Sequence, residues 1–154
     1  MGLTLRVAER CAAFIITMLL GAMPALPATT ADSNQELAAT AQEARQTVVV
    51  INWFYAAHHA CPQPSRPEEL AMVRGELGDG FSVEPHGQFI EIRGISMPGV
   101  GWLYYSSSDH PDKCTLWRTL GRDPTLIWRR RRDGGQWLFD PGDGGPQRTL
   151  KITP

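Results

Sequence analysis

The hydrophobic pattern changes its period near Gly78 and Gly80, and this change limits the possible folds more than any other feature. Before these glycines, apolar residues recur at steps of three and four, which is typical of helices. After them, short runs of alternating apolar and polar residues are separated by glycine, proline or aspartate turns, which is typical of strands. This order predicts an α+β fold, in which a long N-terminal helix and a short second helix pack on an antiparallel β-sheet.

The long helix is expected between Ser33 and Ala60, because this stretch has no glycine or proline and Ser33 forms a capping-box pattern with Glu36. Its second half, Val48–Tyr55, is apolar nearly all round, so we expect it to be buried. A strand over Thr47–Tyr55 is the alternative, since β-branched and aromatic residues favour sheets. One continuous helix would be about 42 Å long, so it would extend beyond a domain of this size or fray at its start.

A second capping-box pattern, Ser65-x-x-Glu68 with a proline between, predicts a short helix that ends at Gly78. Period-two patterning then predicts strands up to the C-terminal end of the sequence. These strands are expected over Phe81–Val83, Gln88–Arg93, Gly101–Ser106, Thr115–Leu120, Leu126–Arg132, Gln136–Phe139 and Leu150–Ile152.

The N-terminal residues have the layout of a secretory signal peptide. Arg6 and Arg10 precede an apolar run of about 13 residues, Cys11–Met23, which prolines and small residues follow. This run is shorter than the roughly 17 to 25 residues that cross a bilayer, and no second such run occurs in the sequence. We therefore expect a signal peptide over residues 1–31, a single exported α+β domain over residues 32–154, a periplasmic or secreted location, and no membrane span in the mature chain. A signal that is kept as an uncleaved anchor is the alternative.

Removal of that signal would leave two of the three cysteines, Cys61 and Cys114. An even pair of cysteines in an exported protein predicts one disulfide bond. Two unpaired buried thiols are one alternative. A metal site is another, but the pair lacks the Cys-x-x-Cys spacing that zinc sites show.

A hairpin over Ile127–Phe139 is the main candidate for a binding surface, with a two-residue turn centred on Asp133-Gly134 or on Gly134-Gly135. Both registers give the same two faces. One face carries Trp128, Arg130, Arg132, Trp137 and Phe139, and the other carries Ile127, Arg129, Arg131, Gln136 and Leu138. Because tryptophan and arginine are enriched at binding hot spots, the first face is the predicted binding surface. The alternative is that its tryptophans belong to the core and its arginines keep the hairpin tip soluble.

Catalytic and metal-binding motifs are weak in this chain. Ser106–His110 contains the residue types of a hydrolase triad, but five consecutive residues cannot adopt the geometry of a triad. Nucleophile-elbow, phosphate-loop, dinucleotide and zinc-protease motifs do not occur in the sequence. A formal net charge of -1 argues against a dedicated nucleic-acid binder. We therefore predict no catalytic residue, no metal, no cofactor and no nucleic-acid partner.

The order of a long N-terminal helix, a Cys-Pro step at Cys61-Pro62 and an antiparallel sheet resembles the globular domain of pilin-like and pseudopilin proteins. The resemblance covers roughly Ser33 to Leu120 at the level of architecture. Arg10-Cys11-Ala12-Ala13 does not provide the glycine-ended leader of those proteins. The resemblance therefore implies a pilin-like fold that is released into the periplasm.

These observations lead to one functional hypothesis with two alternatives. We expect a non-enzymatic domain that binds another envelope or extracellular protein, in an inhibitor, immunity or assembly role. One alternative is a small-ligand carrier with a cavity lined by aromatic residues, namely Trp53, Phe54, Trp102, Tyr104 and Trp117. The other is an enzyme with an unrecognised site, in which His86, Asp109, His110 and Asp112 would converge.

Overall fold

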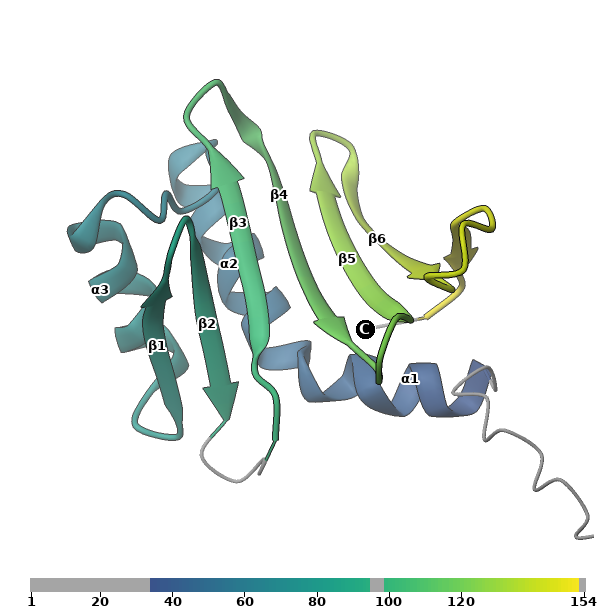
Figure 1. Cartoon of the computed structure of the whole chain (residues 1–154). Coiled ribbons are helices and arrows are strands. Elements are labelled where there is room, and N and C mark those ends of the chain that lie inside the picture. The colour runs from purple at the N-terminus through teal and green to yellow at the C-terminus, as the bar shows by residue number, and fades with distance from the viewer. Residues whose placement is uncertain (1–33, 95–98, 153–154) are drawn as a thin grey trace, which may run out of the picture.

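The computed structural model describes residues 34–94 and 99–152, so the predicted signal peptide, residues 1–31, lies outside the described part. The described residues form three helices and a seven-stranded sheet, which is a mixed α+β fold (Figure 1). The helices are α1 (Asn34–Glu43), α2 (Arg45–His58) and α3 (Pro67–Leu77). The strands are β1 (Phe81–His86), β2 (Phe89–Gly94), β3 (Trp102–Ser107), β4 (His110–Thr119), β5 (Thr125–Arg131), β6 (Gly134–Asp140) and β7 (Arg148–Leu150).

The sheet is an antiparallel meander in which the strand order is the chain order, β1 to β7. The prediction of an antiparallel sheet is therefore confirmed, and the strands follow in the expected order, although β4 begins at His110 instead of Thr115 and β7 shares only Leu150 with its prediction. Figure 1 shows α2 and α3 behind the sheet, while α1 runs across the lower ends of β4 and β5. The helices therefore cover one face of the sheet.

The prediction of one long N-terminal helix is wrong, because the helix breaks at Ala44. Ala44 has a ψ angle of -1°, and its N–H donates to the carbonyl of Ala41, three residues back, at 3.1 Å. A tightened turn of this kind changes the direction of a helix without proline or glycine. Arg118 of β4 forms an ion pair with Glu43 at the end of α1, beside the break. The break resolves the problem of length, since α1 follows the end of the sheet instead of extending beyond it.

The helical assignment of Thr47–Tyr55 is confirmed, but its complete burial is not. Ile51 and Phe54 are each 1% exposed, because they face the sheet. On the outer side of α2, Val49 is 55% exposed and Trp53 is 42% exposed. The helix α2 is therefore buried on the face toward the sheet and exposed on the opposite face, although both faces carry apolar residues.

The short second helix is confirmed, although its expected capping box does not form. Arg66 precedes the helix without a side-chain cap, Pro67 occupies the first turn, and Gly78 ends the helix with a φ angle of 76°. The carboxylate that acts at this end is Glu69, which accepts the N–H of Gln63 at 2.7 Å. Glu69 therefore binds the backbone N–H of Gln63, in the segment before α3, instead of capping an N–H group of the helix.

The main core lies between α2, α3 and the covered face of the sheet. Its members are the inward side chains of the helices and of strands β1 to β6, which alternate with outward ones. Core residues include Val48, Ile51, Phe54, Val73, Leu77, Val83, Ile90, Ile92, Trp102, Tyr104, Leu116, Leu126, Trp128 and Trp137.

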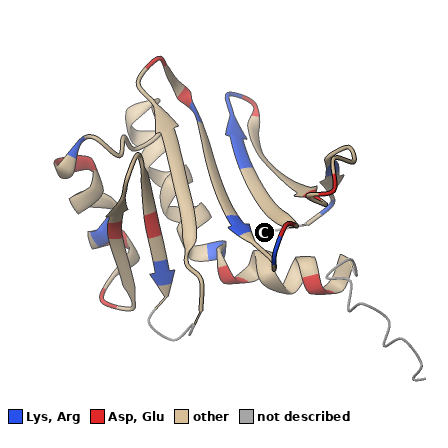
Figure 2. Cartoon of the chain, in the orientation of Figure 1, with Lys and Arg blue, Asp and Glu red and all other residues tan. Residues whose placement is uncertain are grey.

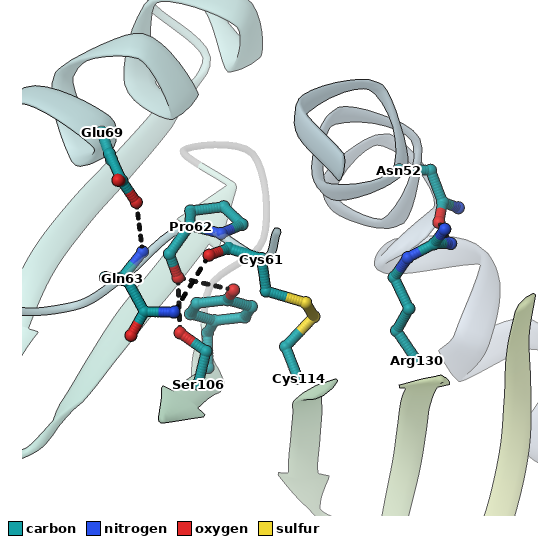
Figure 3. The surroundings of a disulfide bond; sticks show 9 residues. Asn52, Cys61, Pro62, Gln63, Glu69, Ser106, Cys114 and Arg130 are labelled. Atoms are coloured by element: carbon teal, nitrogen blue, oxygen red, sulfur yellow. Dashed lines mark hydrogen bonds between the residues drawn. A yellow bond between two sulfur atoms is a disulfide. The ribbon is translucent and has the colours of Figure 1, made fainter. Parts of the chain in front are cut away.

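A disulfide bond joins Cys61, in the segment between α2 and α3, to Cys114 of β4, as predicted. The neighbouring Pro62 carbonyl accepts hydrogen bonds from the Tyr104 hydroxyl at 2.8 Å and from the Ser106 hydroxyl at 2.5 Å (Figure 3). Burial raises the pKa of Tyr104 far above its usual range, so this hydroxyl keeps its proton and remains a donor. Covalent and hydrogen bonds thus attach the helical layer to the middle strands of the sheet.

Removal of the disulfide is expected to cost a large part of the stability. The bond closes a loop of 53 residues, and the chain-entropy model assigns about 4 kcal/mol to a loop of that length. The variant Cys61→Ser, Cys114→Ser should lower the free energy of unfolding by about that amount in urea titrations. A loss below about 1 kcal/mol would contradict a role for this bond as the main attachment of the helical layer.

Candidate functional site

The predicted hairpin is formed by β5 and β6, but its turn lies one residue earlier than expected. Trp128 pairs with Trp137, and Arg131 pairs with Gly134, so Arg132 and Asp133 form the turn. Both predicted turn positions are therefore wrong. The packing of Trp128 explains the register, because a Cβ atom at Gly135 would lie 2.5 Å from the indole Nε1. This register places Gly135, which has no side chain, against the Trp128 ring, and it preserves the two predicted faces.

The face predicted to bind is the face that packs on α2. Trp128, Trp137 and Phe139 are 3%, 6% and 3% exposed, and Trp102 meets Trp137 edge to face with ring centroids 5.8 Å apart. These three aromatic residues are thus part of the folded interior. Their role in binding remains a prediction.

The two predicted arginines have different surroundings. Arg130 stacks over the Tyr55 ring at 3.8 Å and donates to the side-chain oxygen of Asn52, so it joins β5 to α2 (Figure 3). Arg132 lies in the turn, is 88% exposed, and approaches Asp112 at 4.0 Å. The structure therefore brings Trp128, Trp137 and Arg130 together behind the sheet and leaves Arg132 at the tip of the hairpin.

The opposite face of the sheet carries an apolar row that no described helix covers. We name this face the open face, and the transverse row consists of Leu103, Trp117, Ile127 and Leu138. Each member is paired directly with the next across four neighbouring strands, β3 to β6. Leu103 and Trp117 are half-buried in the isolated chain, whereas Ile127 and Leu138 are only 8% and 6% exposed. An apolar row across the middle of a solvent-facing sheet is unusual, because such faces are normally polar.

Aromatic rings enlarge the transverse row at the β2 end. Phe89 meets Trp117 edge to face with centroids 5.1 Å apart, and it meets Tyr105 at 5.8 Å. Tyr105 is 38% exposed, whereas its neighbour Tyr104 is 1% exposed on the covered face. The three rings form one cluster on the open face, and this kind of surface is enriched at protein interfaces.

Two cations adjoin the transverse row on the open face. Arg129 pairs with Thr115 on one side and with Gln136 on the other, and Arg131 follows on the same face at the end of β5. Figure 2 shows positive charge concentrated at the upper end of β5 and in the turn that follows. No carboxylate of the described residues forms an ion pair with Arg129 or Arg131. The open face therefore combines an apolar centre with unpaired positive charge at one end.

The residues considered for catalysis come from more than one element: His86 ends β1, and Asp112 lies near the start of β4. Ser107, Asp109 and His110 lie in or beside the turn between β3 and β4, where the Ser107 hydroxyl accepts the Asp109 N–H at 3.2 Å. No group of three or more His, Cys, Asp or Glu residues within the described ranges has the geometry of a metal site. Nor does any helix in those ranges have the length and apolarity needed to cross a membrane.

The open face was not recognised as a candidate site from the sequence, although a signal for it exists. In β3, the run Trp102-Leu103-Tyr104-Tyr105 places apolar or aromatic side chains on both faces of the strand. Leu116-Trp117 does the same in β4. A strand that is apolar on both sides requires a cover on both sides. This alternation does not show which side the helices occupy, and the sequence therefore favours the hairpin in which tryptophan alternates with arginine.

Comparison with known proteins adds no family to these observations, since no family model, curated protein or solved structure matches the chain.

The two arginines of the predicted surface should respond differently to truncation. Arg130→Ala removes the stacking on Tyr55 and leaves the Asn52 oxygen without its donor, so it should lower the free energy of unfolding by about 1 to 3 kcal/mol. Arg132→Ala removes an exposed side chain and should change the same quantity by less than about 0.5 kcal/mol. Equal losses in urea titrations of the two variants would contradict the placement of Arg130 against α2.

The register of the hairpin can be tested at a glycine. Gly135→Ala forces the Trp128 ring to move, so it should destabilise the protein by about 1 to 3 kcal/mol. Gly75 of α3 is the matched control, because nothing lies within 4 Å of an added Cβ atom there. Gly75→Ala should stabilise the protein by about 0.5 to 1 kcal/mol through helix propensity. A Gly135→Ala protein as stable as the wild type would argue against the pairing of Trp128 with Trp137.

Proposed function

We propose that the protein is an exported, non-enzymatic domain that binds another envelope or extracellular protein through the open face of its sheet. An inhibitor, immunity or assembly role fits this description. The observation that carries the proposal is the transverse row, an apolar stripe across four strands on the face that no described helix covers. This site replaces the predicted surface on the other side of the same hairpin.

Leu103, Trp117 and Tyr105 leave apolar surface in contact with water on the open face, which costs free energy. Apolar surface is stabilised when a second layer removes it from solvent, and sheets of this kind normally obtain that layer from helices or from another sheet. Leu103, Trp117 and Tyr105 are still partly accessible in the isolated chain. A partner that covers them would gain apolar burial at the centre of the contact, where binding energy is concentrated.

The positive charges beside the transverse row indicate which kind of partner surface would fit the open face. Arg129 and Arg131 adjoin the row without a carboxylate partner among the described residues. A partner with an apolar patch bordered by aspartate or glutamate would match both features, and the charges would also speed its association. We therefore propose an acidic rim on the partner opposite the upper end of β5.

The arrangement of the aromatic residues argues against the carrier alternative as it stands. Phe54, Trp102 and Tyr104 fill the core, Trp53 lies outside α2, and Trp117 lies on the open face. The gap between α2, α3 and strands β1 to β3 is about 10 Å³, which is at the lower limit for one water molecule. These five residues therefore do not surround a common cavity.

The disulfide supports the exported location, since such bonds persist in oxidising compartments.

A photoreactive benzophenone residue placed at Tyr105 tests the proposal in living cells that produce and export the protein. Irradiation should produce one dominant adduct with another protein, because Tyr105 lies on the open face and is 38% exposed. The matched control places the same residue at Val49, which is 55% exposed on the outer side of α2. Charge reversal by Arg129→Glu and Arg131→Glu should reduce the Tyr105 adduct on the order of tenfold, whereas Arg132→Glu should leave it.

Three results would overturn the proposal. The first is the absence of any adduct from Tyr105, and the second is an equal yield of the same adduct from Val49. The third is an adduct that joins two copies of this chain, because it would replace a different partner with self-association.

A further inference from the structure

A groove lies on the covered side of the sheet, where α2 does not extend over the last strands. This groove has a volume of about 340 Å³, within the range of sites for small molecules. Its walls are the side of α2, the hairpin of β5 and β6, and the segment at the end of β7. The lining residues are Val48, Asn52, Trp128, Gly135, Gln136, Trp137, Leu150, Lys151 and Ile152.

The groove contains the two tryptophans that the sequence singles out for binding. Trp128 and Trp137 are paired across β5 and β6, and both line the groove although they are largely buried. The Trp128 indole lies against Gly135, whose missing side chain leaves the ring edge accessible from the groove. Leu150 pairs directly with Trp137, Ile152 follows it along the chain, and both pack against the core. These residues give the groove an apolar body that suits a flat or chain-like ligand.

Several hydrogen-bond donors line the groove, beside the side-chain amide of Gln136. No acceptor among the described residues takes the Trp128 or Trp137 indole N–H, and neither belongs to the fully buried polar atoms without a partner. Lys151 also lines the groove, and its ammonium group has no ion-pair partner within the same residues. The Asn52 oxygen is already occupied by Arg130, which leaves the amide nitrogen as the free end. A site of this composition favours a ligand that supplies acceptors and negative charge.

We propose that this groove binds a small carboxylate. Its apolar body lies against Trp128, Trp137 and the wall formed by Leu150 and Ile152, and its carboxylate meets Lys151 and the Trp128 indole N–H. The site lies on the opposite side of the sheet from the open face, so it is independent of the proposed protein partner.

The probe is 3-phenylpropionate, with 3-phenylpropanamide as the uncharged ligand of the same shape. The protein is produced from the full sequence, and its indole N–H signals are followed by NMR. The five tryptophans give five such signals, which single Trp→Phe variants assign. The acid should shift the signals of Trp128 and Trp137 and leave those of Trp53 and Trp117 unchanged. The amide should bind at least about threefold more weakly, because it lacks the charge that Lys151 meets.

Lysine variants provide a matched pair, since Lys113 and Lys151 are the only lysines in the sequence. Lys151→Gln should raise the Kd of the acid by about threefold or more, while Lys113→Gln should leave it unchanged. The proposal is overturned if the acid shifts no indole signal or shifts that of Trp117 instead. It is also overturned if acid and amide bind equally, or if both lysine variants have the same effect.

Discussion

The structure depends on one constraint of area, because two helices cannot cover both faces of a seven-stranded sheet. Helices α2 and α3 are fixed to one face by the Cys61–Cys114 disulfide and by the hydrogen bonds to the Pro62 carbonyl. The open face is therefore left without a helical layer, and the groove appears where α2 no longer covers the last strands. Both candidate sites follow from the same shortage of cover. The exposed side of α2 at Val49 and Trp53 has the same origin, since no described element packs outside that helix.

Much of the architecture could be predicted from the sequence, because local signals decided it. Gly78, with its left-handed backbone, ends α3 where a glycine is expected. Period-two patterning indicated the strands in their observed order, with the largest error in the bounds of β4 and β7. Cysteine parity was sufficient for the disulfide. The division of the β5–β6 hairpin into two faces was also correct. A turn that moves by one residue along the chain changes the pairs but leaves the same side chains on each face.

The errors concern tertiary packing, which no local signal contains. The break at Ala44 has no proline or glycine to indicate it, and it serves the fit of α1 to the end of the sheet. The hairpin register follows from the contact between Trp128 and Gly135 rather than from turn preference. Most importantly, both faces of β3 and β4 are apolar, so the sequence alone could not tell which face α2 would cover. For this reason the binding surface predicted from the sequence lies on the covered side of the β5–β6 hairpin, whereas the surface that we propose for a protein partner lies on the open face.

Hydroxyl-radical footprinting, read by tandem mass spectrometry, tests most directly whether one face of the sheet is covered and the other is open. Tyr104 and Tyr105 are adjacent in β3 but point to opposite faces, with exposures of 1% and 38%. The structure predicts rapid oxidation of Tyr105, with Trp53 as an exposed reference, and protection of Tyr104 and Trp128. Oxidation of Tyr104 or Trp128 as fast as Tyr105 would show that the helices do not cover that face, and it would contradict the assignment of the open face.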